Sequence, residues 1–185
     1  LLRRLAMEAP GTYHHSIVVG NIAEAAAEAI GADGLFCRVA SLYHDVGKVI
    51  RPHFFIENQS SENLHNNINP SLSSLIVTSH VKDGVELAEE YRLPPPIIAI
   101  IREHHGTCLI KYFYHRAVTS STDEPSPGLE YQFRYEGPRP QTKESGIIML
   151  ADSVEAASRT LEKPTPGRIR DLIERILRDR LADGQ

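Results

Sequence analysis

Residues 44–48 read His-Asp-Val-Gly-Lys and place an imidazole, His44, directly before a carboxylate, Asp45. The pair comes at the end of an apolar pattern that predicts a helix over roughly 34–46. Successive helix residues point about 100° apart, so the imidazole can bind one cation while the carboxylate reaches between two. The stretch therefore predicts a metal centre built into a helical protein.

Helical periodicity extends in both directions from this stretch. Helices are predicted over the ranges 13–30, 34–46, 70–91, 97–114, 145–161 and 166–182. The core stripe predicted for the first helix consists of Val18, Val19, Ile22, Ala26 and Ile30. A strand is considered only at 131–135, and no internal repeat is visible. The sequence predicts one all-α domain, a helical bundle over 1–185, with a final helix at 166–182. Residues 119–143 contain four prolines and are predicted to form a long excursion loop.

The composition excludes several functional classes. The 185 residues are 41% hydrophobic and 24% charged, which is typical of a globular domain. Twenty Lys and Arg against 24 Asp and Glu leave a formal charge of −4, so a broad basic surface for duplex nucleic acid is not expected. No run of about 18 apolar residues is present, so we expect a soluble chain. Cys37 and Cys108 are too few for a disulfide framework. The chain begins at Leu1 without an initiator Met, so we expect a fragment of a longer protein.

The unusual feature of the composition is its nine histidines, several of which lie on predicted apolar helix faces or beside an aspartate. The candidate ligands are His15, His44, Asp45, His80, His104, His105 and Asp152. A single buried histidine is usually a hydrogen-bonded core residue, but seven buried polar side chains must satisfy one another or share a cation. Imidazole and carboxylate together suit Fe, Mn, Zn, Co or Ni rather than Ca or Mg. Seven ligands are too many for one ion and about right for two, an arrangement common in enzymes that hydrolyse phosphate esters.

The order of these motifs resembles a known family. His15, the pair His44–Asp45, and Asp152 are similar to the H…HD…D signature of the HD-domain metal-dependent phosphohydrolases. Longer strings are more specific: GTYHHS at 11–16, HDVGK at 44–48, FFIENQ at 54–59, REHHGT at 102–107, PQTKE at 140–144 and MLADSVEA at 149–156. Together they resemble the cytosolic HD domain of the seven-transmembrane HD family, over nearly the whole chain from residue 8 to about 161.

This resemblance implies an HD fold with two metal ions, iron or manganese, that hydrolyses cyclic di-AMP to linear pApA. The implied first site consists of His15, His44, Asp45 and Asp152. The implied second site consists of His80, His104 and His105, with Asp45 bridging the two. Lys48 is expected beside a substrate phosphate, and the catalytic residues are expected to be His44, Asp45 and Lys48. The resemblance also implies a bacterial plasma-membrane protein that carries this domain in the cytoplasm.

Three alternatives stay open at this point. The cyclic di-GMP phosphodiesterases of the HD-GYP branch also have a His-His pair, but theirs is followed by Glu and a Gly-Tyr-Pro segment, whereas Gly106 and Thr107 follow His105 here. HD nucleotidases and dNTP hydrolases usually carry fewer histidine ligands. A non-catalytic domain that binds metal or nucleotide for signalling would need the same ligands.

Several further residues receive ordinary structural interpretations. His14 lies on a more polar stripe than His15, so we expect His15 to be the ligand. Arg51 and Asn58 fit nucleotide contact and solvent exposure equally well, and the aromatic residues 112–114 are expected to pack at a helix end. The arginines of the last predicted helix alternate with acids and are expected to face solvent: Arg168, Arg170, Arg175, Arg178 and Arg180.

Overall fold

The computed structural model describes residues 1–59, 62–120 and 128–185, and this part of the chain is helical with no β-strand. The α-helices are α1 (Leu2–Glu8), α2 (Pro10–Ala29), α3 (Gly34–Ser41), α4 (Pro70–Glu90), α5 (Pro95–Glu103), α6 (Lys111–Ser120), α7 (Lys143–Ser158) and α8 (Pro166–Ala182). Short 3-10 helices are η1 (Val46–Ile50), η2 (Pro52–Phe54), η3 (Ile56–Asn58), η4 (Leu64–Asn67) and η5 (Leu129–Phe133). The all-α prediction is confirmed. Among the described residues, no helix is both long and apolar enough to cross a membrane.

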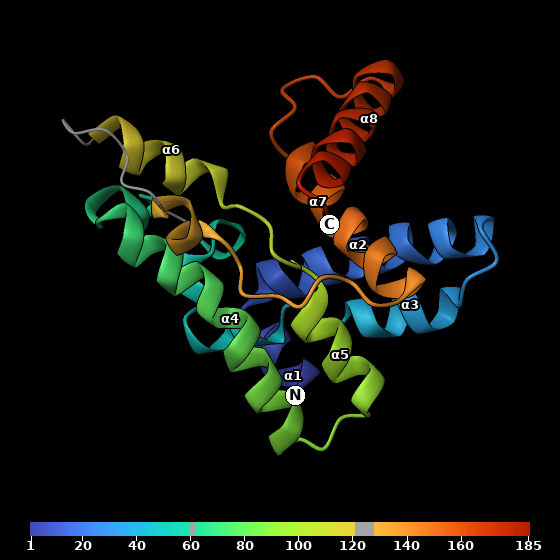
Figure 1. Cartoon of the computed structure of the whole chain (residues 1–185). Helices are drawn as coiled ribbons and strands as arrows, with labels where there is room; N and C mark the ends of the chain where they lie inside the picture. The colour runs from blue at the N-terminus through green and yellow to red at the C-terminus, as the bar shows by residue number, and fades with distance from the viewer. Residues whose placement is uncertain (60–61, 121–127) are drawn as a thin grey trace.

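The main core lies where α2, α3, α5 and α7 meet (Figure 1). Its buried members are Val19, Ala23, Ala27, Cys37, Ala40, Ile100, Ile147, Ile148 and Ala151. Two smaller clusters join the rest of the fold to it, one under α1 and one between η1, α4 and α5. Helix α8 packs along α7, which returns the C-terminal end of the chain toward the middle of the molecule (Figure 1).

The buried face of α2 differs from the predicted core stripe. The face that packs inward carries Val19, Ala23 and Ala27, whereas Ile22 and Ile30 are exposed. Small residues allow α2 to approach α3 closely, and a Cβ on Gly20 would lie 3.2 Å from the carbonyl oxygen of Arg38. Shape complementarity between the two helices therefore outweighs the hydrophobicity of the larger isoleucines here.

The His44–Asp45 pair lies in a turn and not on the predicted helix. Helix α3 ends at Ser41, and residues 42–45 form a turn that leads into η1. The cause is a close approach to α4, because a Cβ on Gly47 would lie only 1.9 Å from the carbonyl oxygen of His80. The turn packs η1 directly against α4 and brings His44 and Asp45 beside His80.

The predicted helix over 97–114 is divided into α5 and α6. Helix α5 ends at Glu103, and residues 104–107 form a turn in which Gly106 has φ +52°. Glycine adopts this left-handed conformation at little cost. The break lets His104 and His105 lie at the end of α5, while α6 leaves in another direction to pack against α4 (Figure 1).

The predicted loop over 119–143 is only partly described. Residues 121–127 lie outside the described residues, residues 119–120 belong to α6, and η5 occupies Leu129–Phe133. The segment considered as a strand therefore forms a 3-10 helix followed by a single bridge between Leu109 and Arg134. This bridge holds the end of η5 against the chain that follows His105.

Candidate metal centre

Seven polar side chains from five parts of the fold meet inside the helical bundle. Helices α2, α4 and α7 contribute His15, His80 and Asp152, the turn after α3 contributes His44 and Asp45, and the turn after α5 contributes His104 and His105. Six of the seven are buried, and His105 is partly exposed. The structure thus brings together every ligand that the sequence predicts, and it leaves His14 exposed on the surface of α2.

Asp45 lies at the middle of this cluster and faces two groups of histidines. Its Oδ2 atom is 3.3 Å from Nε2 of His44 and 3.5 Å from Nε2 of His15. Its Oδ1 atom is 3.3 Å from Nε2 of His80 and 3.6 Å from Nε2 of His104. One carboxylate therefore presents a separate oxygen to each group.

Backbone carbonyls fix the orientation of three of the imidazoles. In each, Nδ1 lies within hydrogen-bond distance of the carbonyl oxygen three residues earlier: 2.6 Å for His44, 2.6 Å for His80 and 2.8 Å for His104. A carbonyl can only accept, so Nδ1 carries the hydrogen and Nε2 is left as the free ligand atom. This is the arrangement by which protein groups commonly orient histidine ligands.

His15 is oriented by a carboxylate instead. Its Nδ1 atom lies 2.5 Å from Oε2 of Glu155, and its Nε2 atom lies 3.0 Å from Oδ1 of Asp152. Arg159 donates two hydrogen bonds to the other oxygen of Glu155 and holds that carboxylate in place. Because Glu155 lies one helical turn after Asp152, α7 contacts both nitrogens of the same imidazole.

The unsatisfied atoms of the cluster fit a divalent cation. Within the described chain, Nε2 of His44 and both carboxylate oxygens of Asp45 are buried without a hydrogen bond of normal geometry, although the Lys48 ammonium lies 2.7 Å from Oδ2. Nε2 of His80 lies 3.3 Å from Nε2 of His104, and two lone pairs at that distance repel unless they share a cation. Buried polar groups that do not satisfy one another indicate a missing partner.

The potential ligands form two groups that share one residue. The first consists of His15, His44, Asp45 and Asp152, and the second consists of Asp45, His80, His104 and His105. In each group the ligand atoms lie within 4.8 Å of one another. Imidazole nitrogen and carboxylate oxygen are a donor set for first-row transition metals. The cluster is therefore a metal-binding arrangement by chemistry as well as by distance.

The electrostatics of the cluster keep its carboxylates ionised. Burial raises the pKa of Asp45, but the charges of Lys48 and His44 lower it well below its usual range. Burial likewise raises the pKa of Asp152, but the hydrogen bond from His15 and the nearby imidazole of His44 bring it well below its usual range. Burial also lowers the pKa of His44, yet Asp45 and Asp152 raise it to about 10. A divalent cation would compete with that proton for Nε2 of His44.

Lys48 pairs with two carboxylates at the edge of the cluster. Its ammonium lies 2.7 Å from Oδ2 of Asp45 and donates to Oε1 of Glu57 at 2.9 Å. Glu57 also accepts from the hydroxyl of Thr12 at 2.9 Å, and Asn58 accepts from the backbone N–H of Thr12 at 3.1 Å. The segment around η3 is thereby joined to α2, and the Lys48 side chain, 13% exposed, is held at the cluster.

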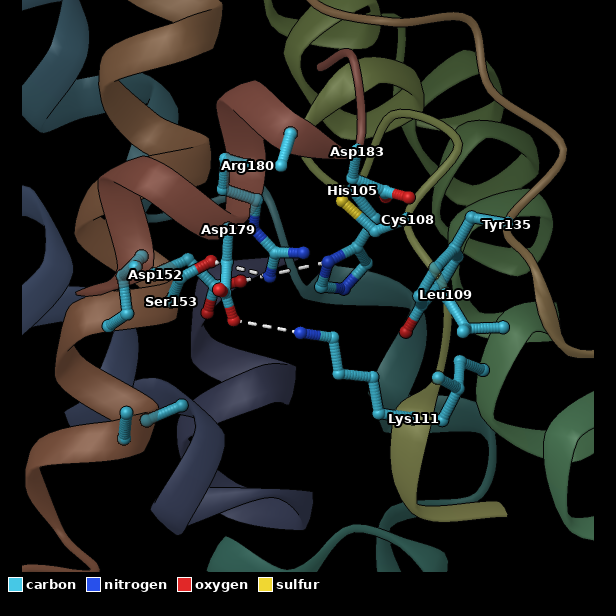
Figure 2. A pocket seen from close by; sticks show the side chains of 15 residues that line it. His105, Cys108, Leu109, Lys111, Tyr135, Asp152, Ser153, Asp179, Arg180 and Asp183 are labelled. Atoms are coloured by element: carbon cyan, nitrogen blue, oxygen red, sulfur yellow. Dashed lines mark hydrogen bonds and ion pairs between the residues drawn. The ribbon is translucent and has the colours of Figure 1, made fainter. Parts of the chain in front are cut away.

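Asp152 lines two cavities. The larger, about 690 Å³, lies between α7, α8 and the chain after His105 (Figure 2). The smaller, about 290 Å³, is lined by His15 and Lys48 and extends along α7 to Arg159. Each cavity therefore includes residues of the cluster in its wall.

Sequence reasoning overlooked three residues that support this centre. Glu155 and Glu57 occur in the quoted motifs, but neither was assigned a role, and each contacts a residue that is remote in sequence, His15 for Glu155 and Thr12 for Glu57. Tyr135 stacks on His105 with ring centroids 4.2 Å apart. Of the three, only Glu155 could have been found from the sequence, because it lies one helical turn after Asp152. Arg51, for which nucleotide contact and solvent exposure were both expected, pairs with Asp83 at 2.6 Å.

Comparison with known proteins agrees with this geometry. The family model described as HD domain matches residues 12–157. The chain is 48% identical to the cyclic-di-AMP phosphodiesterase PgpH of Bacillus subtilis and 49% identical to that of Listeria monocytogenes, over 100% of this chain but only 26% and 25% of those proteins. The chain thus spans about a quarter of the curated relatives it matches.

A solved structure is similar over the whole chain. The crystal structure of the L. monocytogenes phosphodiesterase PgpH HD domain in complex with cyclic-di-AMP superimposes with a TM-score of 0.94 at 49% identity, and the match covers 100% of this chain and 85% of that one. The family match, the helical fold and the paired His/Asp groups agree with one another. The chain belongs to the HD domain family.

Proposed function

We propose that this chain is a metal-dependent phosphodiesterase that opens the ring of cyclic di-AMP to give linear pApA. The observation that carries the proposal is the position of Asp45, whose two oxygens each face a separate group of histidines. The proposed ligands of the two ions are His15, His44, Asp45 and Asp152 for one, and His80, His104 and His105 with Asp45 for the other. Iron or manganese suits this donor set. The whole of 1–185 is proposed to act as one domain.

Two divalent ions supply, when bound, an activated water and neutralisation of charge on phosphoryl oxygens. The protein's own residues position the side chains that would hold the ions and the substrate phosphate. Asp45 and His44 are held by Lys48 and by the carbonyl of Ser41, so they need little reorganisation when substrate arrives. Lys48 faces the smaller cavity, where its ammonium can approach a phosphoryl oxygen. Water adds to phosphorus and the bond from phosphorus to the 3′ oxygen breaks, which opens the ring.

The choice of cyclic di-AMP rests on the similar proteins. Both PgpH relatives carry that substrate in their name, and the similar HD domain was crystallised with it. Those relatives are about four times as long as this chain, which supports a domain of a longer protein. From the resemblance to the seven-transmembrane HD family, we also propose that the longer protein lies in a bacterial plasma membrane and carries this domain in the cytoplasm.

Product analysis tests this function. The domain is loaded with Mn(II) or Fe(II), and cyclic di-AMP, cyclic di-GMP and a dNTP are offered separately. We expect pApA from cyclic di-AMP, loss of turnover in Asp45→Ala, and unchanged turnover in Asp171→Ala, whose side chain is exposed on α8. Turnover of cyclic di-GMP alone would contradict the assignment of cyclic di-AMP as the substrate. A metal-loaded protein without turnover of any of the three would contradict catalysis and favour a signalling role.

A further inference from the structure

Arg180 departs from the solvent-exposed position expected for the arginines of the last helix. It lines the larger cavity together with His105 and Asp152, which belong to the metal-binding groups. Figure 2 shows its guanidinium directed into the cavity, toward Ser153 and His105. Arg178, two residues earlier, points away and is 78% exposed. One arginine of α8 therefore faces the metal centre, although the sequence pattern of the helix does not single it out.

The Arg180 guanidinium forms no ion pair in the described part of the chain, and the charges of Asp179 and Asp183 act on it only from a longer distance. Its Nη2 donates to the hydroxyl of Ser153 at 3.0 Å, and its Nε atom is buried without a hydrogen-bond partner. Lys111, which also lines this cavity, is neutralised by Asp179 at 2.8 Å. A partly buried guanidinium is costly unless an anion satisfies it. The missing anion is expected to be a ligand.

The chemistry of the cavity fits part of a nucleotide. Its walls include apolar side chains, among them Leu109, Ile110 and Ile176, while Arg180 supplies N–H donors from a planar guanidinium. A guanidinium of this kind matches two oxygens of a phosphate. A cyclic dinucleotide has two phosphates in one ring, and only one of them reacts at a time. When one phosphate lies at the metal ligands, the second must be held beside them.

We propose that Arg180 binds the second, non-reacting phosphate of the cyclic dinucleotide, with the attached nucleoside in the cavity between α7, α8 and residues 108–111. This inference rests on the proposed function and extends it, because it assigns a residue that distinguishes a two-phosphate substrate from a simple phosphodiester. Arg180 is a substrate-binding residue that contacts no reacting atom. Its loss is expected to raise KM and to leave kcat and metal content nearly unchanged.

The experiment compares two substrates and three variants. Arg180→Gln should raise KM for cyclic di-AMP about tenfold to a hundredfold, as expected for loss of a charge-assisted hydrogen bond, and should leave hydrolysis of bis(p-nitrophenyl) phosphate, which has one phosphate, unchanged. Arg180→Lys keeps the charge without the planar guanidinium and should show a smaller rise. Arg178→Gln is the matched control, because Arg178 pairs only with Glu174 on the surface of the same helix.

The outcomes separate this inference from the proposed function. An equal loss on both substrates, or no loss on either, would overturn the role of Arg180 while the phosphodiesterase activity stands. If the wild-type protein does not hydrolyse cyclic di-AMP, the proposed function fails, and calorimetric titration of wild-type and Arg180→Gln protein with cyclic di-AMP then decides. An unchanged Kd would overturn the inference, and a weakened Kd would support it. Should Arg180→Gln not fold, Arg180→Lys carries the same comparison.

Discussion

Replacing Gly47 by alanine tests whether the close packing of the His44–Asp45 turn on α4 positions the centre. The added Cβ would lie 1.9 Å from the carbonyl oxygen of His80 and 2.5 Å from the backbone nitrogen of Gly84. Ordinary contact begins at about 3.4 Å, so α4 and the turn must separate by about 1.5 Å. Both neighbours are backbone atoms and cannot rotate away. We therefore expect the free energy of unfolding to fall by about 3 kcal/mol, at the upper end of the range for overpacked cores. For a domain of this size that lowers Tm by roughly 6–12 °C.

The same displacement separates His80 from Asp45, so metal content and turnover should fall with stability. A shift of about 1 Å in catalytic geometry commonly costs a hundredfold in rate. Gly146→Ala is the control, because no atom lies within 4 Å of its added Cβ in α7. That change should raise stability by about 0.5–1 kcal/mol. Thermal unfolding and metal analysis of both variants measure these changes in Tm and metal content. A Gly47→Ala protein with the wild-type Tm and metal content would show that the close packing of the turn on α4 does not position the centre.

Three further changes have defined outcomes. Glu155→Ala removes the acceptor of the His15 Nδ1 hydrogen bond and should weaken Mn(II) affinity about tenfold to a hundredfold in a competition titration, and unchanged affinity would exclude this orienting role. His15→Ala should abolish turnover while His14→Ala, at an exposed position, leaves it largely intact, and equal losses would contradict the ligand assignment. For Asp183, burial raises the pKa but the hydrogen bonds from Arg134 hold it below its usual value. A depressed carboxyl pKa stabilises the fold above the unfolded-state pKa of about 3.9, and this contribution is lost as pH falls through the folded value. Asp183→Asn should therefore cost about 1–2 kcal/mol at pH 7 and progressively less below pH 4 in urea unfolding, and a cost independent of pH would argue against the ion pair.

The meeting of the seven polar residues could be predicted because each is a polar residue in an apolar helical pattern, which indicates that it is buried. His80 lies on an apolar helix stripe, and Asp152 ends a run of core residues. Such groups cannot be buried singly without a large cost, so they must meet. No knowledge of the helix directions was needed for that conclusion.

The path of the chain through the site was not predictable in the same way. The turn at His44–Asp45 follows from the contact of Gly47 with α4, whose sequence lies about thirty residues away. The division of the helix over 97–114 depends on Gly106, whose left-handed conformation is decided by tertiary packing. The inward face of α2 depends on the fit of small residues to α3. Periodicity within one segment contains none of this information.

Supporting residues are missed for a related reason. Glu57 and Arg180 look like ordinary surface charges, and their positions at the centre depend on contacts with Lys48 and Ser153. A charge on an amphipathic helix usually faces solvent. Only the assembled structure shows which arginine of α8 lines a cavity beside the metal-binding groups.

We expect Asp45 to bridge two metal ions held by separate groups of histidines. Crystals of the Mn(II)-loaded domain, measured for anomalous scattering at the manganese edge, would show this arrangement. Two anomalous peaks are expected, one beside each carboxylate oxygen of Asp45, with His44 on one side and His80 on the other. A single peak, or two peaks of which either lies away from Asp45, would contradict this arrangement.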